Sequence, residues 1–438
     1  MSKYKLSTQL IKNICSGPLK VFLNAIVVFF SYRYFLQVFG PNKYAIWLLL
    51  AVIVDFGRLG SLGVNDVAIK YIAEAKQQNN IPRISAYITT CLTIIVVFFT
   101  IIFIPIFLIK NAAPSFLQID PQYTPLFFEM YDKILFLSFL TVVMDFMLGI
   151  LYGLNRADFA NYLQSGGNII GTLLAIALVY MNFDFNGLYL GVLFGTVIVI
   201  MVSLLFSYRI LNYFPFRFSY INHTLAMDIM RKSVIIFSAN ILNLLFQPAG
   251  KILISRYIGS IEVICYDLAF KLSFAIRNLF VIGLKALISE ISGIQNEYYK
   301  LVDLLKKIYK YLLVSSVFVY GIFYIFSEQI LRIWLADAYM PLMNFSFRVI
   351  HITYFLNLLA VPVYYCLFGQ GHFKKILGVH SIQSILALAL SLFYLVLLHG
   401  KSFEIFLFIT FISTFTADLY LVFQFRKNIL SLREAKEF

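Results

Sequence analysis

Charged residues are scarce in this chain. Asp, Glu, Lys and Arg make up 13% of its 438 residues, whereas 61% of the residues are hydrophobic. A water-soluble protein of this length needs more polar surface than this to cover its core. The shortage of charge therefore excludes an ordinary soluble domain and indicates a chain that lies mostly within a membrane.

Cysteine is also scarce, and the common catalytic motifs are missing. The four cysteines are isolated in or near apolar segments, which argues against disulfides and against a zinc site. The sequence has no P-loop and no Gly-x-Gly-x-x-Gly, Gly-x-Ser-x-Gly or His-Glu-x-x-His pattern. We therefore predict no enzymatic activity, no metal site and no cofactor beyond a coupling H⁺ or Na⁺. A membrane glycan polymerase is the main enzymatic alternative, but such proteins generally have a larger external loop than the one expected at 110–132.

Long apolar runs, in contrast, are abundant. Each run of about 20 residues is long enough to cross ~30 Å of hydrocarbon as a helix. We predict an all-α polytopic membrane protein with about twelve spans in two six-helix bundles, residues 1–215 and 216–438. The predicted spans are 18–39, 44–64, 86–109, 133–154, 161–180, 187–210, 233–255, 263–287, 308–326, 345–368, 376–398 and 405–425.

Lys and Arg are distributed unevenly over the loops between these spans. The two terminal segments and every second loop carry most of them, and the intervening loops carry few. Basic residues concentrate on the cytoplasmic side of membrane proteins. We therefore predict a multi-pass membrane protein with both termini in the cytoplasm. The basic N-terminal segment reads as a retained tail and not as a cleaved signal peptide.

Several cations fall inside the predicted spans. A charge at membrane depth costs ~2.5–3.5 kcal/mol on insertion scales, so such residues line a polar interior and usually have a function. The planar guanidinium of Arg suits phosphate oxygens because it donates two hydrogen bonds at once. We predict a cationic cavity that binds an anionic substrate, although structural ion pairing is the alternative for each residue. The candidate substrate-binding residues are Arg33, Arg58, Lys251, Lys271, Arg277 and Arg348.

Acidic residues and one histidine form a second group within the spans. Spacing places Asp55 for i,i+3 pairing with Arg58, and Asp267 for i,i+4 pairing with Lys271. The histidine could titrate near neutral pH as part of a proton relay, but a hydrogen bond to a neighbouring helix is the alternative. The candidates for charge pairing or ion coupling are Asp55, Asp145, Asp267, His351 and Asp418.

The segment 38–74, VFGPNKYAIWLLLAVIVDFGRLGSLGVNDVAIKYIAE, is the most informative stretch. Read as one continuous helix, it places five residues within an arc of about 100°. These residues are Asp55, Arg58, Leu62, Asn65 and Asp66. We predict that this face lines the cavity.

An internal duplication is a further prediction. A shift of 219 residues aligns Gly40 with Gly259 and Arg58 with Arg277. Because an equal number of predicted spans lies on either side of the centre, both halves would enter the membrane in the same direction, as parallel repeats. The repeats would place one arginine in each half, facing a common cavity.

Two segments carry a resemblance to a known family. The first is the Gly turn, the Tyr44-x-x-Trp47 helix and the run DFGRLGSLGVNDVAIKYIAE; the second is LYGLNRADFANYLQSGGNIIGTLLAI. Together they resemble the polysaccharide-exporter branch (O-antigen flippase, Wzx-type) of the MATE-like MOP superfamily. The similarity of plan extends over nearly the whole chain.

The resemblance implies a V-shaped pair of bundles working by alternating access. Its substrate would be an undecaprenyl-diphosphate-linked oligosaccharide of O-antigen, lipopolysaccharide or another surface glycan. Membrane lipids, a polysaccharide polymerase and a chain-length regulator would be the partners, and nucleic acid would not. The cationic lumen would be formed by Arg58, Lys251, Lys271 and Arg277. The alternative function is a cation-coupled multidrug exporter of the MATE type, whose mostly cationic substrates such a lumen would repel.

Overall fold

The computed structural model describes residues 8–61, 63–213, 216, 220–221, 223–284, 298–370 and 372–437. Helices make up 91% of the structure, and no strand occurs within these ranges. Nine of the helices described are long and apolar enough to cross a membrane. The prediction of an all-α membrane protein is confirmed, whereas the count of twelve spans stays a prediction.

The chain folds as two compact units. The N-terminal unit comprises Met1–Phe39 and Ile46–Ile241, and the C-terminal unit comprises Gly40–Ala45 and Leu242–Phe438. The division into six-helix bundles at residue 215 stays a prediction.

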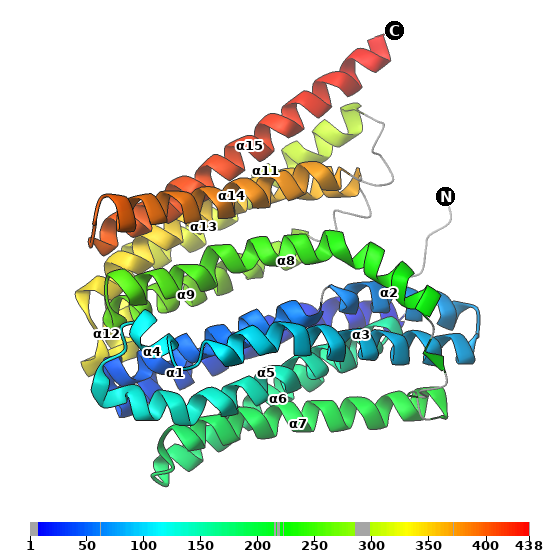
Figure 1. Ribbon diagram of the computed structural model, residues 1–438. Coiled ribbons are helices and arrows are strands. Elements are labelled where there is room, and N and C mark those ends of the chain that lie inside the picture. The colour runs from blue at the N-terminus through cyan, green and yellow to red at the C-terminus, as the bar shows by residue number, and fades with distance from the viewer. Residues whose placement is uncertain are drawn as a thin grey trace. The chain divides into compact units, whose positions relative to one another are not determined.

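The N-terminal unit contains the helices of the first part of the chain, together with the first part of α8 (Figure 1). Short 3₁₀ turns, η1 and η2, join some of them. The elements are α1 (Thr8–Gly57), η1 (Arg58–Ser61), α2 (Val64–Gln77), α3 (Ile81–Leu108), α4 (Ala113–Phe116), η2 (Pro121–Tyr123), α5 (Thr124–Gly153), α6 (Ala157–Tyr180), α7 (Asp184–Leu211) and α8 (His223–Tyr257).

The C-terminal unit contains the end of α8 and the helices that follow it. Its helix α12 is short and lies between the long helices α11 and α13 in the chain, and η5 is a short π-helical segment. The elements are α9 (Ser260–Leu284), α11 (Tyr298–Ile325), α12 (Ser327–Leu335), η4 (Ala336–Ala338), α13 (Pro341–Gly369), α14 (Phe373–Leu392), η5 (Phe393–Leu397) and α15 (Phe403–Glu437).

Helix α1 covers the first two predicted spans, with a kink between them. Gly40 has φ 71° and ψ 167°, a conformation outside the helical region that only glycine adopts at little cost. The Gly-Pro-Asn turn expected from the sequence is therefore a bend within α1.

A second break separates α1 from α2, and it corrects one prediction. The segment 38–74 is not one helix: α1 ends at Gly57, Arg58 begins the 3₁₀ turn η1, and Gly63 precedes α2 with φ 70°. An arc counted at 100° per residue therefore does not extend from Asp55 to Asp66. The reason is local, because the Gly-rich run after Arg58 favours a turn over a continued helix.

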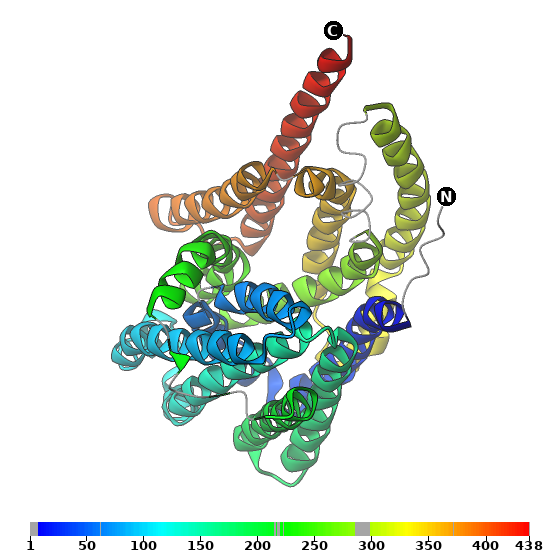
Figure 2. The same cartoon turned by 90° about the vertical axis from the view of Figure 1, so that its right-hand side faces the viewer.

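Helices α6 and α7 lie side by side in both views (Figures 1 and 2) and approach each other closely along a row of glycines. A Cβ atom added to Gly171 would lie 2.7 Å from the Gly191 carbonyl oxygen, and one added to Gly195 would lie 2.5 Å from the Gly167 carbonyl oxygen. Small residues permit such close backbone contacts between membrane helices.

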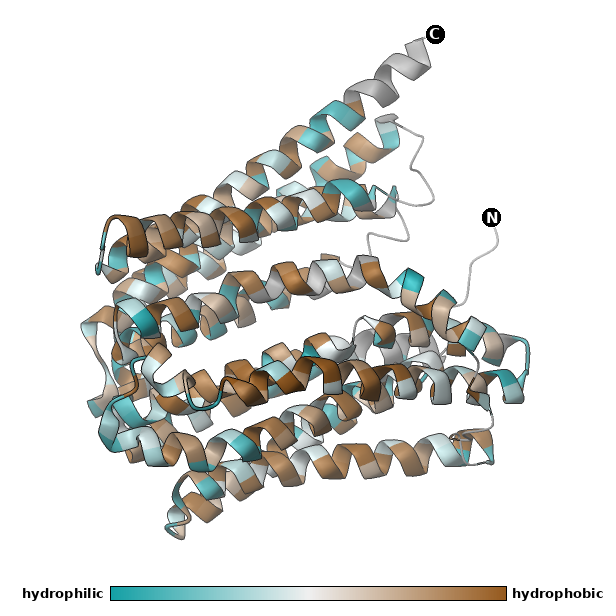
Figure 3. Cartoon of the chain, in the orientation of Figure 1, coloured by the Kyte–Doolittle hydropathy of each residue, from teal (hydrophilic) through white to brown (hydrophobic). Residues whose placement is uncertain are grey.

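Hydropathy follows the expected pattern within individual helices. Figure 3 shows hydrophobic residues along most of α3 and α7, and hydrophilic residues at the connection between α2 and α3. Helix α9 departs from this pattern because Glu262, Asp267, Lys271 and Arg277 lie within it. The charged helix therefore marks the part of the C-terminal unit where a polar site is to be sought.

Candidate substrate and ion site

Arg58 is the centre of a charged cluster in the N-terminal unit. Its Nε lies 3.3 Å from Asp145 Oδ2 on α5, and its Nη1 lies 3.5 Å from Asp55 Oδ1 at the end of α1. The i,i+3 pairing expected of Asp55 is therefore present. The Arg58 side chain is 50% exposed and both contacts are long, so the guanidinium can exchange its carboxylate partners for another anion at small cost.

Lys20 lies in the first half of α1. It interacts electrostatically with the carboxylate of Asp145, the same group that Arg58 contacts. The carboxylate of Asp145 therefore interacts with a cation of α1 in addition to Arg58.

Lys251, Asp267 and Lys271 form a second cluster, in the C-terminal unit. Lys251 Nζ on α8 lies 2.5 Å from Asp267 Oδ1, and Lys271 Nζ lies 2.6 Å from Asp267 Oδ2. The Asp267 side chain is fully buried, the Lys251 side chain is 8% exposed and that of Lys271 is 37% exposed. Among the described residues of this cluster, one carboxylate contacts two ammonium groups, and Lys271 is the more exposed of the two lysines.

A third arrangement links three helices of the C-terminal unit. Arg277 Nε on α9 donates to Asn357 Oδ1 on α13 at 2.8 Å, and Asn357 Nδ2 donates to Asp418 Oδ1 on α15 at 2.8 Å. The guanidinium also lies 5.9 Å from the centre of the Tyr354 ring. Asp418 is buried, and its Oδ2 accepts no hydrogen bond from the residues that the structure describes. This oxygen is available to a proton or a small cation.

The remaining candidates lie apart from these clusters. Arg348 donates to Ser327 Oγ at 2.8 Å and stacks at 5.3 Å on Tyr324, so it connects α13 with the start of α12. His351 is buried between two aromatic rings, and its Nε2 lies 3.1 Å from the Tyr320 carbonyl oxygen, to which it donates. Arg33 is half-buried on α1 and belongs to none of the groups above.

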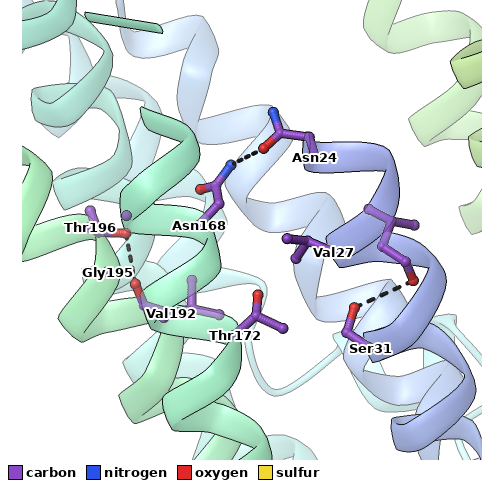
Figure 4. A pocket seen from close by; sticks show the side chains of 11 residues that line it. Asn24, Val27, Ser31, Asn168, Thr172, Val192, Gly195 and Thr196 are labelled. Carbon is purple, nitrogen blue, oxygen red and sulfur yellow. Dashed lines mark hydrogen bonds between the residues drawn. The ribbon is translucent and has the colours of Figure 1, made fainter. Parts of the chain in front are cut away.

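A cavity of about 230 Å³ in the N-terminal unit was not expected from the sequence. It lies between α1, α6 and α7. Figure 4 shows Asn168 of α6 and Asn24 of α1 pointing toward each other, with Asn168 Nδ2 donating to Asn24 Oδ1 at 3.2 Å. A hydrogen-bonding pair of amides therefore lines the cavity.

Comparison with known proteins decides the family. The family of polysaccharide biosynthesis proteins matches residues 10–295, which is well over half of the chain. The chain belongs to this family. A search of curated proteins found no match.

Solved structures show which fold this polysaccharide biosynthesis protein has. An inward-facing multidrug-resistance MATE transporter of the MOP superfamily is 15% identical, with a TM-score of 0.76 over 96% of this chain and 98% of that chain. A MOP-superfamily transporter from Pyrococcus furiosus is 13% identical, with a TM-score of 0.66 and 96% of each chain covered. The Vibrio cholerae MATE transporter VcmN is 13% identical, with a TM-score of 0.65 over 98% of this chain and 99% of that chain. The fold is that of a MATE-like membrane transporter.

Sequence reasoning missed several residues of these groups because they are neutral or lie near a helix end. Asn357 bridges Arg277 and Asp418, yet a search for intramembrane charge passes over an amide. Asn168 was missed for the same reason. An amide within an otherwise apolar helix would have been the usable signal, because its polar groups also require partners in a membrane.

Proposed function

We propose that this polysaccharide biosynthesis protein is a flippase for undecaprenyl-diphosphate-linked oligosaccharides and works by alternating access. The observation that carries the proposal is the combination of this family with a MATE-like transporter fold. The oligosaccharide would be a repeat unit of O-antigen or of another surface polysaccharide. Transport across the bilayer, and not bond-making chemistry, would be the activity.

Accessible cations in each unit support an anionic substrate. Arg58 in the N-terminal unit and Lys271 in the C-terminal unit are both partly exposed. The contacts of Arg58 with its two carboxylates are long enough to be exchanged. Lys271 shares the single carboxylate of Asp267 with Lys251. Phosphate oxygens are good ligands for both groups. We assign Arg58 to the diphosphate, and Lys271 and Arg277 of the C-terminal unit to other anionic groups of the substrate, with Arg33 and Arg348 as further binding residues. Lys251, buried against Asp267, would hold that carboxylate in place.

Ion coupling would act through the acidic residues of the same clusters. A proton on Asp145 would weaken its hold on Arg58 and so free the guanidinium for phosphate. The open oxygen of Asp418 would take a proton or Na⁺ next to Asn357. Asp55, Asp267 and His351 would then act as charge-pairing or hydrogen-bonding residues.

The proposed setting is the bacterial inner membrane with both termini in the cytoplasm. Lipid-linked oligosaccharide is made available at the cytoplasmic leaflet and would be released at the periplasmic leaflet. A polysaccharide polymerase and a chain-length regulator would act on the product there.

Cation-coupled drug export is the competing function, because multidrug MATE transporters share this fold. A transporter of the same fold from Pyrococcus furiosus is described as having a binding pocket of reversed polarity. Charge in the binding site thus differs among proteins of this fold. The cation excess around Asp267 favours an anionic substrate over a cationic drug.

A deletion strain tests the proposal. Loss of the chain should reduce surface polysaccharide and leave lipid-linked oligosaccharide in the cytoplasmic leaflet. Unchanged surface polysaccharide, or loss of cationic dye efflux instead, would contradict the proposed function.

Complementation then tests the anion site. The double variant Arg58→Ala/Arg277→Ala should fail to restore polysaccharide. Arg332→Ala is the control, because Arg332 is an exposed residue of α12 that pairs with Glu328, and it should complement fully. Full complementation by the double variant would contradict the assignment of the anion site but not the proposed function.

A further inference from the structure

The α1–α6–α7 cavity is polar at a depth where lipid would surround the helices. Asn168 lies at the middle of α6, a helix that is otherwise apolar enough to span a membrane, and its side chain is exposed. An amide facing hydrocarbon would leave its hydrogen-bonding groups unsatisfied. Asn24 satisfies one N–H of Asn168, and the remaining groups of the amide favour water or a polar ligand on this side of α6, whereas the exposed Ile170 and Leu173 suit lipid.

Hydrogen-bonding groups remain available around the cavity. The Asn24–Asn168 pair uses one amide N–H and one carbonyl oxygen, and leaves the Asn24 amide N–H groups and the Asn168 oxygen. Figure 4 shows the Thr172 hydroxyl on the side of α6 that faces α1, without a hydrogen bond to the other residues drawn. Ser31 donates to the Val28 carbonyl oxygen and can still accept. The cavity thus offers both donors and acceptors.

None of the 11 residues that line the cavity is charged. Gly167 and Gly171 let α6 approach α7 closely, and both glycines line the cavity. At about 230 Å³ the cavity is several times larger than the ~30 Å³ share of one water molecule. Such a space suits an uncharged ligand rich in hydroxyl and amide groups.

The first residue of α1 that lines the cavity, Asn24, lies one helical turn after Lys20. Lys20, which interacts with the Asp145 carboxylate beside Arg58, precedes Asn24 by four residues on α1. Four residues of helix rise about 6 Å, and residues at i and i+4 lie on the same face. A diphosphate at Arg58 and Lys20 would therefore have its directly attached sugar beside Asn24.

We propose that the α1–α6–α7 cavity binds an uncharged sugar ring of the transported molecule, next to the diphosphate. This inference rests on the proposed function and makes it more specific: one subsite selects a neutral sugar through Asn24, Asn168 and Thr172. Acidic sugars would be bound elsewhere, at the cations of the C-terminal unit.

Two probes separate sugar binding from diphosphate binding. The full-length protein in lipid nanodiscs is titrated with undecaprenyl diphosphate, and with undecaprenyl diphosphate carrying one N-acetylglucosamine. The wild-type protein should bind the sugar-bearing probe about tenfold more tightly, the effect of one or two net hydrogen bonds. The double variant Asn168→Leu/Thr172→Val should lose this preference while its affinity for the sugar-free probe stays unchanged.

Thr93→Val is the matched control, because Thr93 lies on α3 and its hydroxyl donates to Thr89 within that helix. This variant should keep the preference. If the double variant does not fold, the near-isosteric single variant Thr172→Val replaces it in the test. This single variant should lose part of the preference for the sugar-bearing probe.

The outcomes distinguish the inference from the function on which it rests. If the double variant keeps the full preference, or weakens both probes equally, the sugar subsite is wrong although the protein binds lipid diphosphates. Equal affinity of the wild-type protein for both probes would also show that the sugar subsite is wrong. If the wild-type protein binds neither probe, the proposed function fails, and the subsite fails with it.

Discussion

Exposure separates the charged residues of this chain into two kinds. Lys251 and Asp267 are 8% and 0% exposed, and their charged atoms lie 2.5 Å apart. Arg58 is half exposed, and its two carboxylate partners lie 3.3 and 3.5 Å away. Removing one partner of a buried ion pair leaves the other charge buried and unpaired. In an exposed ion pair, water or a ligand can replace the lost partner. Removal of one partner should therefore destabilise the fold at the buried pair, whereas the exposed pairs can exchange partners at a smaller cost.

Substitution of Asp267 should reveal this difference. Asp267→Asn leaves the buried Lys251 ammonium without its carboxylate, and it should lower the free energy of unfolding by ~3–5 kcal/mol. Asp55→Asn, at a site 35% exposed, should lower it by less than ~1 kcal/mol. Thermal unfolding of both variants in detergent measures the effect. Adding Lys251→Met to Asp267→Asn should restore most of the loss; equal melting temperatures for all three variants would contradict the interpretation.

At the level of helices, close backbone contact holds α6 against α7. The glycine row leaves no room for a methyl group at several positions, whereas Gly166, one residue before the row begins, has open space around it. Gly166 and Gly171 of α6 thus differ in the space available for a methyl group.

Alanine substitutions within α6 should separate packing from helix propensity. Gly171→Ala would set a methyl carbon 2.7 Å from the Gly191 carbonyl oxygen, forcing the helices apart, and should destabilise the protein by ~1–3 kcal/mol. Gly166→Ala meets nothing within 4 Å and should stabilise it by up to ~1 kcal/mol, because alanine favours helix. Melting temperatures in detergent should move in opposite directions. A shift of the same sign in both variants would argue against the packing account.

Polar contacts attach the first turns of α8 to α2. The Tyr71 hydroxyl donates to Asp228 Oδ2 at 2.6 Å, and Lys232 Nζ donates to the same oxygen at 2.8 Å and contacts the Tyr71 hydroxyl. The hydrogen bonds from Lys232 and then from Tyr71 hold the pKa of Asp228 below its ordinary value. Since the folded-state pKa is lowered, the contribution of this contact is complete above the ordinary carboxyl pKa of ~3.9. It is lost as the pH falls below that value and through the lowered pKa.

Asp228→Asn should therefore loosen the start of α8 at neutral pH. Amide hydrogen exchange in residues 224–232 should become faster, and the wild-type protein should approach the variant only below about pH 4. Asp303→Asn is the control, since Asp303 pairs only four residues along α11 with Lys307 at an exposed site. If the control accelerates exchange at α8 as much as Asp228→Asn does, the local account is wrong.

For the whole molecule, the distribution of basic residues predicts the orientation in the membrane. The terminal segments and alternate loops are rich in Lys and Arg, and positive residues stay in the cytoplasm. A fluorescent protein fused after the last residue should fluoresce, and alkaline phosphatase at the same place should be inactive. A fusion between Leu398 and Phe403, in the connection to α15, should give the opposite result. Active phosphatase at the C-terminus would reverse the predicted topology.

Composition and spacing were enough to predict the fold class of this protein and two of its ion pairs. Hydrocarbon excludes charge and unpaired backbone groups, so long apolar runs can only be helices, and the rare charges within them stand out. The same reasoning found Arg58, Asp267 and Arg277, and the i,i+3 and i,i+4 pairs follow from helix geometry alone.

The partners across helices required the tertiary structure. That Asp145 meets Arg58, that Asn357 joins Arg277 to Asp418, and that Asn24 faces Asn168 all depend on which helices are neighbours. Helix order and rotation are set by side-chain packing over the whole unit, which periodicity along one segment does not encode. The end of α1 at Gly57 was also not predicted. Residues 55–66 therefore do not share one helical face, because a face defined by 100° per residue requires a continuous helix. Local physics thus predicted the helices and their charges, and packing between helices decided which charges meet.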